Sequence, residues 1–394
     1  MAVNPFNPLK LLGMGCFSLV YSVTPNNDQE RDKVFALKRF FIRHPKALLY
    51  AIKEFNILKR LALSDSVSPF LPKLLYAFRI HASPALVLRQ ESSITLRELI
   101  FVVRNFDEKA IKFYLREIIC GLRYLHALDI VQLDLKPDNI LLSETNHIII
   151  SDFDRSFDFT AKKNIPTGPD FLSTVYYMAP EIARCQVISD KADVWSLGII
   201  ASLFIGDTFR PFTDNVRASF RMASKGQWKL NCYGKISPEF KEFLHACFTY
   251  SYVQRPNVSQ LQNLAFFRDT DWNRVQSLQL HPPYSTHEIK NIVTNLRFNF
   301  DPYSPMILEL LYDRGYPKIK NGNFQFRYKQ DGTQEIIKSS ATVECFSKIG
   351  YTPEMVVDAY RQFNFTNPCL LQQQQQRVIP EDNFNSKNQK ENYR

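Results

Sequence analysis

The sequence predicts an α+β fold, with a strand-rich segment over residues 8–91 followed by a mostly helical one. Residues 11–21 and 34–40 alternate apolar and polar side chains as strands do, and the first of these ranges contains a glycine turn. Residues 110–128 carry apolar side chains at helical spacing, and 194–206 is an apolar run typical of a buried helix. At 394 residues and 45% hydrophobic, the chain can form one large two-lobed domain with an appendage, or two to three small domains.

The composition limits the partners and the compartment that we expect. The net charge of +10 suits an acidic partner such as a nucleotide phosphate, but the basic residues are scattered and no basic-aromatic patch supports nucleic-acid binding. The seven cysteines are odd in number and lack C-x-x-C spacing, which favours free thiols in a reducing compartment. Residues 1–5 do not resemble a signal peptide, and the apolar run 194–206 is too short to span a bilayer. We therefore expect an intracellular protein, cytoplasmic or nuclear, without a membrane partner.

The strand-rich segment combines a glycine turn, a lysine on a strand and a glutamate on a helix. Gly13 and Gly15 allow the backbone to approach a phosphate, although a plain hairpin explains them equally well. The next strand carries Lys38, which a solvated face would also explain. Residues 45–61 form the predicted helix, with Glu54 near the edge of its apolar stripe. The stripe consists of Leu48, Ile52, Phe55, Leu58 and Leu61.

Residues 130–142 place a short polar centre between apolar flanks. Asp134 could take a proton, Lys136 could steady an anion and the Asn139 amide could bind a metal. The alternative is a solvated turn, because D-x-K-P-x-N also suits turn chemistry. A short apolar strand farther along ends in a further carboxylate, Asp152.

The order of these motifs resembles that of eukaryotic serine/threonine protein kinases, over about residues 8–267. The landmarks continue through Ala179-Pro180-Glu181, then Asp193 in a D-x-W-S-x-G motif, and then Arg255. So many landmarks in one order exclude the turn-only explanation of residues 130–142. The resemblance implies a β-rich small lobe over 8–91 and a helical large lobe over 92–267. Within that family, the chain is similar to the calcium/calmodulin- or AMP-activated-kinase-like group.

The resemblance further implies ATP and Mg²⁺ as cofactors and proteins with serine or threonine hydroxyls as substrates. The catalytic residues would be Asp134 as the base, Lys136 at the transferring phosphoryl group and Asn139. Asn139 and Asp152 would bind Mg²⁺. The implied cofactor-binding residues are Gly13, Gly15, Ser18, Val20, Ala36, Lys38, Glu54, the gatekeeper Leu88, the hinge residues Arg89 and Glu91, and Leu141 and Asp152. Lys136 together with Thr174 is the pattern of serine/threonine kinases, and Glu181 would pair with Arg255. Asp138 would either contact a basic residue of the substrate or be solvated, and we expect it to be solvated.

The chain departs from the family pattern at two neighbouring motifs. Gln132-Leu133-Asp134 replaces His-Arg-Asp, and Asp152-Phe153-Asp154 replaces Asp-Phe-Gly. Leu133 cannot pair with a phosphate on the activation segment, so we predict activity that does not depend on phosphorylation there. The candidate phosphorylation sites are Ser156, Thr160, Thr167 and Ser173. Asp154 replaces a flexible glycine, but aspartate tolerates left-handed backbone conformations.

Two other functions fit the fold. A pseudokinase would bind ATP or a partner without transferring phosphate, but such proteins usually lose at least one of the charged site residues that this chain retains. A small-molecule kinase fits less well, because Ala179-Pro180-Glu181 and Thr174 resemble a platform for polypeptides. The segment 152–181 contains Lys162-Lys163 with prolines and a glycine, which indicates a mobile loop or an acidic contact.

Residues 283–366 are predicted to form a helical regulatory or interaction module, with helices over 288–300 and 304–314. Two Gly-Tyr units, at 315 and 350, precede a predicted helix with Phe363 on its apolar side. This arrangement resembles a ubiquitin-associated-type domain, and the resemblance implies regulation of the kinase in cis. The alternative is a helical extension packed on the large lobe. Residues 324–337 alternate apolar and polar side chains like a hairpin, with Asp331-Gly332 as its turn. Residues 370–394 are rich in Gln, Asn, Lys and Glu and should be disordered.

Overall fold

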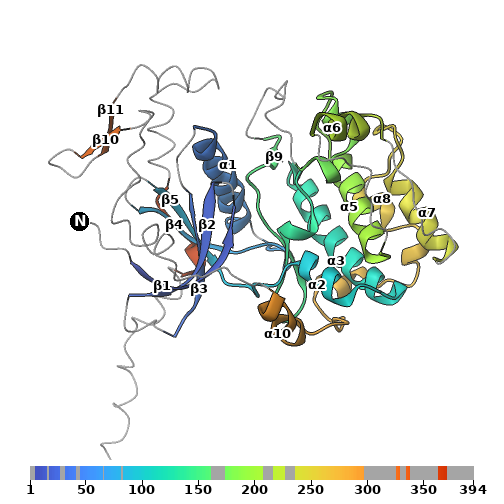
Figure 1. The fold of residues 1–394 in the computed structure, drawn as a ribbon, viewed down its shortest axis with the longest axis horizontal. Coiled ribbons are helices and arrows are strands. Elements are labelled where there is room, and N and C mark those ends of the chain that lie inside the picture. Colours follow the sequence, from blue (N-terminus) through green and yellow to red (C-terminus); the bar gives the residue numbers. More distant parts are fainter. Residues whose placement is uncertain are drawn as a thin grey trace, which may run out of the picture.

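A computed structural model describes most of the chain and shows a strand-rich small lobe beside a helical large lobe (Figure 1). The described residues are 5–15, 17–26, 32–40, 45–64, 66–80, 83–160, 174–206, 216–226, 236–296, 325–328, 334–337 and 363–370. The predicted α+β class with two lobes is confirmed. None of the described helices is both long and apolar enough to cross a membrane.

The small lobe is an antiparallel sheet with one long helix. The sheet order is β1-β2-β3-β5-β4-β12. Its strands are β1 (Phe6–Met14), β2 (Ser18–Pro25), β3 (Phe35–Phe40), β4 (Leu74–Ile80), β5 (Ser83–Arg89) and β12 (Phe365–Thr366). Helix α1 (Pro45–Ala62) buries the predicted stripe against the sheet, since Leu48, Phe55 and Leu58 are almost inaccessible. This burial fixes which side of α1 faces the space between the lobes.

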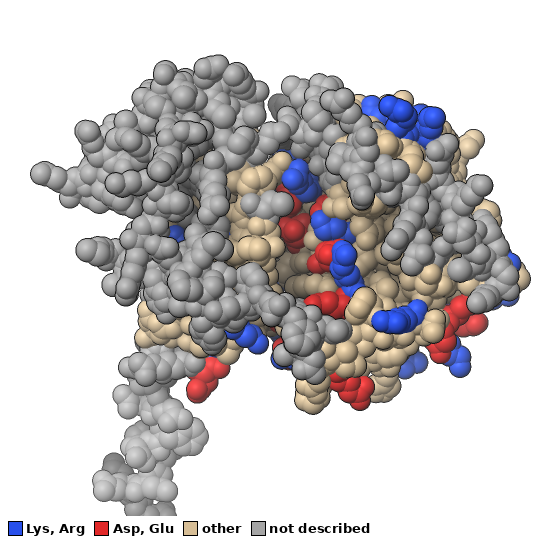
Figure 2. Space-filling model, in the orientation of Figure 1, with Lys and Arg blue, Asp and Glu red and all other residues tan. Residues whose placement is uncertain are grey.

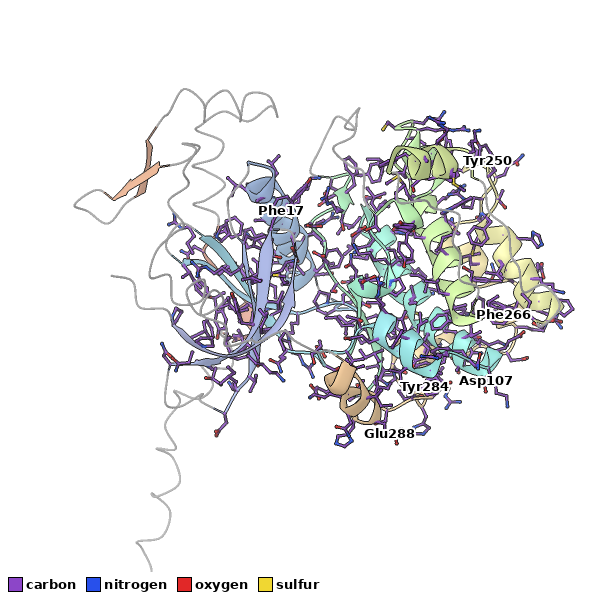
Figure 3. All side chains as sticks on the ribbon, in the orientation of Figure 1. Phe17, Asp107, Tyr250, Phe266, Tyr284 and Glu288 are labelled. Carbon is purple, nitrogen blue, oxygen red and sulfur yellow. The ribbon has the colours of Figure 1, made fainter. Side chains whose placement is uncertain are left out.

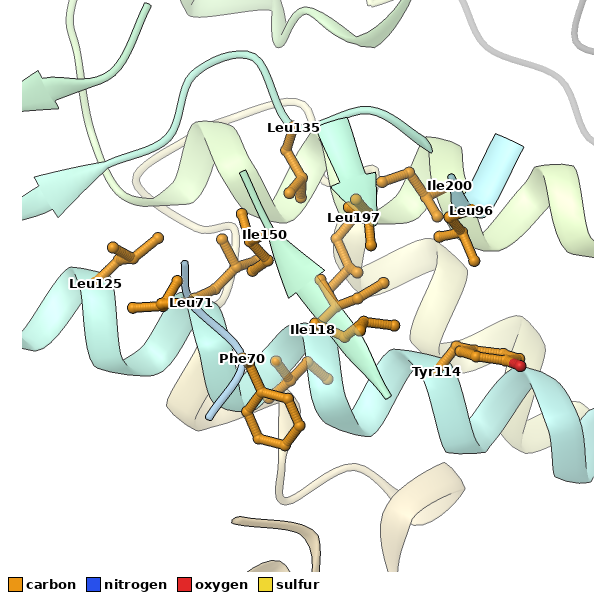
Figure 4. Packing of buried hydrophobic residues seen from close by; sticks show 14 of the residues in the cluster. Phe70, Leu71, Leu96, Tyr114, Ile118, Leu125, Leu135, Ile150, Leu197 and Ile200 are labelled. Atoms are coloured by element: carbon orange, nitrogen blue, oxygen red, sulfur yellow. The ribbon is translucent and has the colours of Figure 1, made fainter. Parts of the chain in front are cut away.

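The large lobe is built around two buried helices, α3 (Glu108–Ala127) and α5 (Lys191–Phe204). Figure 4 shows Ile118 of α3 and Leu197 and Ile200 of α5 packing with Leu135 from the polar loop in one core. The other helices are α2 (Leu96–Val103), α4 (Pro180–Ala183), α6 (Val216–Ser224), α7 (Pro238–Cys247), α8 (Val258–Leu261) and α9 (Trp272–Gln276). Helix α3 begins at Asp107, whose side chain accepts from the Ala110 N–H at 2.7 Å. The apolar run at 194–206 is the buried helix that the sequence predicts.

Two short strand pairs hold the loops between the lobes. Strand β6 (Ile130–Val131) pairs with β9 (Phe157–Asp158), and β7 (Ile140–Leu142) pairs with β8 (Ile148–Ile150). The 3-10 turn η2 (Pro137–Asn139) lies just before β7. These pairs place the loop after β6 next to the loop after β8, so the polar centres of both loops converge.

The chain beyond the large lobe packs on both lobes. Helix α10 (Thr286–Leu296) buries Ile289 and Val293 in the main core, and the Thr286 N–H donates to the Asn146 side chain at 2.6 Å. Strands β10 (Gln325–Tyr328) and β11 (Gln334–Ile337) pair antiparallel, which confirms the predicted hairpin. The predicted helix over 304–314, both Gly-Tyr units and residues 371–394 of the tail predicted to be disordered lie outside the described residues. The ubiquitin-associated-type resemblance therefore stays a prediction.

The segment 363–370 corrects one prediction. Phe363 does not lie on a helix: it precedes β12, which extends the small-lobe sheet beside β4. The Phe363 ring is buried and stacks on Phe55 of α1 with centroids 4.8 Å apart, and Asn367 donates to the Leu74 carbonyl at 2.8 Å. Pairing with an open sheet edge satisfies backbone groups that a helix would satisfy internally, and it lets this ring reach α1.

Candidate active site

The loop after β6 is anchored by one buried carboxylate. Asp193 of α5 is inaccessible to solvent and accepts from the backbone N–H groups of Gln132 and Leu133, each at 2.9 Å. The Oδ2 atom of Asp193 also contacts His126 Nε2 at 2.8 Å. Leu133 has a positive φ of 59°, a conformation uncommon for a non-glycine residue. The anchoring hydrogen bonds hold that turn and aim the following side chain, Asp134, into the space between the lobes.

Asp134 lies at the centre of a hydrogen-bonded cluster. Its Oδ2 contacts Lys136 Nζ at 2.6 Å and accepts from Asn139 Nδ2 at 3.0 Å. Its Oδ1 accepts from the N–H and the hydroxyl of Thr174, at 3.0 and 2.8 Å. Lys136 also donates to the Thr174 hydroxyl at 2.9 Å. A carboxylate and an ammonium thus meet around one hydroxyl, which is the arrangement needed to accept a proton and stabilise an anion beside it.

A second charged cluster crosses from the small lobe to the large lobe. Lys38 Nζ donates to both Glu54 oxygens, at 2.9 and 2.7 Å, and to Asp152 Oδ1 at 2.7 Å. Burial alone would lower the pKa of Lys38, but the Asp152 and Glu54 carboxylates raise it above its ordinary value, so the amine stays charged. Burial would likewise raise the pKa of Asp152, yet Lys38 outweighs this effect and holds that pKa below its usual range. Lys38 and Asp152 therefore carry charge at neutral pH, whereas burial raises the pKa of the Glu54 carboxyl to about 8, an effect that Lys38 opposes.

Strands of the small lobe carry most of the predicted cofactor-binding residues. In the glycine turn, the Gly15 N–H donates to the Ser18 carbonyl at 2.8 Å, and a side chain at Gly13 would meet no atom within 4 Å. Sheet registers place Val20 opposite Lys38 and Ala36 opposite Leu88. Beyond Leu88, the Arg89 side chain is exposed and approaches Glu91 at 3.7 Å, while Leu141 of β7 is half-buried. Val20, Ala36 and Leu88 therefore lie on the same face of the sheet as Lys38, whereas Leu141 approaches from the large lobe.

The donor set fits a magnesium nucleotide. No described residue donates to the Asn139 amide oxygen, and the Asp152 carboxylate is partly exposed between the lobes. Among the described residues, no three His, Cys, Asp or Glu side chains could hold a metal by themselves. Mg²⁺ typically takes one or two protein carboxylates together with substrate phosphates, so a partial set is what such a site requires. Figure 2 shows acidic and basic side chains gathered in the hollow between the lobes.

Gln132 forms a neutral clamp that the sequence did not reveal. Its Nε2 donates to the backbone carbonyls of Ser151 and Asp152, at 2.9 and 3.0 Å. Its Oε1 accepts from the Ser156 hydroxyl at 2.8 Å, and both side chains are buried. Asp152 has a φ of 64°, which is uncommon for a non-glycine residue. The Gln132 amide therefore hydrogen-bonds to the backbone at the residue that has this conformation. The residue before Leu133 thus acts through an amide where the family pattern has a histidine.

Asp154 does not need the left-handed conformation that a glycine would supply. Among the described non-glycine residues with positive φ are Asp152 and Leu133, but Asp154 is not one of them. Burial and the Asp152 carboxylate raise the pKa of Asp154 to about 6, which Lys38 opposes. The substitution therefore adds a carboxyl group to the charged site without forcing the backbone.

Leu133 packs the activation segment through an apolar cluster. The side chain is buried with Phe157 and Met178, which lie near the two ends of that segment (152–181). Farther along, Arg255 donates to both Glu181 oxygens at 2.7 and 3.1 Å, as the resemblance implied. The prolines, the lysines at 162–163, Thr167 and Ser173 lie outside the described residues. Ser156 is buried and hydrogen-bonded, so it is a poor target for a modifying enzyme.

Two further contacts attach α1 to the segment after Asp154. The Arg155 guanidinium lies 4.2 Å from the centroid of the Tyr50 ring and donates to the Tyr50 hydroxyl at 2.9 Å. Phe17 of the glycine turn contacts the same ring, with centroids 5.4 Å apart, and Figure 3 shows it beside α1. At the other end of the helix, Arg60 pairs with Asp158 at 2.9 Å. No local sequence signal pairs these residues, because each contact joins distant segments.

Comparison with known proteins supplies the family. A family model described as the protein kinase domain matches residues 6–267. Ribosomal protein S6 kinase alpha-3 of Mus musculus is 31% identical over 290 residues, which cover 71% of this chain and 38% of that protein. Ribosomal protein S6 kinase alpha-6 of Mus musculus is 31% identical over 301 residues, 75% of this chain and 38% of that protein. The chain therefore spans well under half the length of these relatives.

Proposed function

Because the chain belongs to the protein kinase domain family, we propose that it transfers the γ-phosphoryl group of ATP, with Mg²⁺, to serine and threonine hydroxyls of proteins. The observation that carries this proposal is the shared contact of Asp134 and Lys136 with the Thr174 hydroxyl. The relatives described above are named ribosomal protein S6 kinases, which supports a protein substrate. The calcium/calmodulin- or AMP-activated-like group remains a narrower proposal that these relatives do not support.

In this proposal, each charged side chain has one task. Asp134 accepts the proton of the substrate hydroxyl, and Lys136 stabilises charge on the transferring phosphoryl group. Lys38, held by Glu54, binds phosphate oxygens of the nucleotide, and the glycine-turn amides approach them from above. Asn139 and Asp152 would hold Mg²⁺, which supplies positive charge against the phosphates when it is bound.

The direct test is phosphate incorporation into a mixed serine/threonine peptide library with Mg²⁺ and ATP. We expect the wild-type protein to label peptides and Asp134→Asn to lose about a thousandfold in rate, since a positioned base contributes about 10²–10⁴. Asp134→Asn should keep ATP binding and an unchanged melting temperature, which separates chemistry from folding. A wild-type protein that binds ATP but labels nothing would be a pseudokinase, and the proposal would be wrong.

We also propose that the C-terminal segment regulates the site in cis. The support is that Phe363 and Phe365 contact Phe55 on α1, the helix that carries Glu54. Losing a buried phenyl ring costs about 3–5 kcal/mol, enough to release such a short segment from the lobe. The printed contacts of the segment are with α1 and β4, so this proposal concerns the position of α1 rather than the chemistry.

Phe363→Ala in the full chain tests this second proposal. We expect kcat to fall by about tenfold and hydrogen exchange in α1 to rise, because α1 loses its outer support. The exposed Leu63→Ala just after α1 serves as the control and should change neither quantity. Equal kcat in the wild type and in Phe363→Ala would contradict regulation in cis.

A further inference from the structure

One ion pair stands beside the catalytic loop. Arg97 Nη1 of α2 donates to both carboxylate oxygens of Asp138, at 3.0 and 3.2 Å. Asp138 lies in the turn between Lys136 and Asn139, two residues to which the proposed function gives phosphoryl and metal contacts. The Arg97 side chain is 67% exposed and that of Asp138 is 37% exposed, so both are accessible to another molecule.

The ion pair borders the place where the acceptor hydroxyl must sit. Asn139, the residue after Asp138, donates to Asp134 Oδ2 at 3.0 Å, and the Thr174 hydroxyl donates to Asp134 Oδ1 at 2.8 Å. A polypeptide that brings a hydroxyl to Asp134 therefore passes beside the ion pair.

The arrangement discriminates by charge. Asp138 alone would attract a basic side chain, but here its two oxygens already accept from a tethered guanidinium that an incoming base would have to displace. Arg97 uses only Nη1, and its Nε and Nη2 donate to no group within the described residues. Guanidinium groups bind carboxylates and phosphates through such paired donors. The open side of the ion pair is therefore complementary to an acidic side chain.

We propose that Arg97 is a specificity-determining residue that selects peptide substrates with an acidic or phosphorylated side chain near the acceptor serine or threonine. This inference rests on the proposed kinase function. Exposed ion pairs contribute little to stability, so Arg97 can turn toward a substrate without cost to the fold. Screening weakens such contacts, so the preference should shrink as salt rises.

Neutral serine peptides in which each flanking position is replaced in turn by Asp, Gln or Arg test this inference. The quantity measured is the ratio of kcat/KM for the best Asp peptide to kcat/KM for its Arg counterpart. We expect a wild-type ratio of about five to ten, as for an exposed charge contact. Arg97→Gln should bring the ratio to about one or below, Arg97→Glu should favour the Arg peptide, and Arg97→Lys should restore most of the acidic preference.

Arg104→Gln is the matched control, because Arg104 follows the same helix at its other end and is exposed. Its ratio should equal that of the wild type. A wild-type ratio below one, or a ratio unchanged in Arg97→Gln, would overturn the inference while leaving kinase activity intact. A protein that phosphorylates none of the peptides would overturn the proposed function, and the inference with it.

Discussion

The two sides of the active site are held by different forces. The nucleotide side depends on charge, since Lys38 contacts Glu54 and Asp152 at 2.7 Å in a sheltered site. The side behind the catalytic loop is neutral: the Gln132 amide clamps backbone carbonyls, and Leu133 packs with apolar residues of the activation segment. In the proposed function, the charged side meets the phosphates of the nucleotide, whereas the neutral side holds the backbone in place.

This difference predicts how much stability and activity a substitution on each side removes. Removing one partner from a buried ionic cluster leaves an uncompensated charge, so the loss is large. Removing one neutral hydrogen bond leaves carbonyls that water can partly satisfy, so the loss is smaller and graded. We therefore expect the neutral side to need no phosphate, because Leu133 stands where the family pattern has an arginine that a phosphate would neutralise.

Lys38→Met should give the largest effect. We expect loss of phosphate transfer and a decrease of about 3 kcal/mol in the free energy of unfolding, since Glu54 and Asp152 lose their shared cation. Burial raises the pKa of the Glu54 carboxyl, so uptake of a proton limits the cost. Denaturant unfolding measures the change, and the double variant with Glu54→Gln should recover part of it. A Lys38→Met protein with wild-type activity would contradict an ionic nucleotide side.

Gln132→Leu should have an intermediate effect. The variant keeps the side-chain size but removes three hydrogen bonds around Asp152, so we expect about 1–3 kcal/mol less stability and a lower kcat. Ser156→Ala removes only one of these contacts and should cost about 1 kcal/mol. The concentration of Mg²⁺ needed for half-maximal rate should rise in Gln132→Leu. Equal Mg²⁺ dependence in all three proteins would show that the clamp does not position Asp152.

The sequence predicted the charged side better than the neutral one. Lys38, Glu54, Asp134, Asn139 and Asp152 come together in the structure because phosphate chemistry demands particular residue types at particular chain positions. In the sequence, Gln132 was recognisable only as a departure from the histidine of the family pattern, and its hydrogen bonds were not predicted. Its partner Ser156 is 24 residues away, and an amide can bond to many groups, so no spacing indicates the contact.

The C-terminal segment was the least predictable part of the fold. Asn367 contacts Leu74 across 293 residues, through a strand of two residues with no periodicity of its own. The sequence therefore favoured a helix at Phe363, where the structure places a chain bound to a sheet edge. By contrast, α1, α5 and the strands β10 and β11 followed their local patterns. Helix α1 buries one regular apolar face, α5 is an apolar run that is buried almost throughout, and β10 and β11 are neighbouring segments that pair antiparallel.

Dephosphorylation tests the central difference most directly. The exposed Thr160 is hydrogen-bonded to Asp158, and Leu133 offers no cation for a phosphate on this segment. Peptide phosphorylation should be measured before and after phosphatase treatment of the full chain, with the phosphatase removed and the absence of phosphate checked by mass spectrometry. We expect kcat to change by less than about twofold. A loss of tenfold or more, reversed by rephosphorylation, would contradict an activation segment held by neutral contacts.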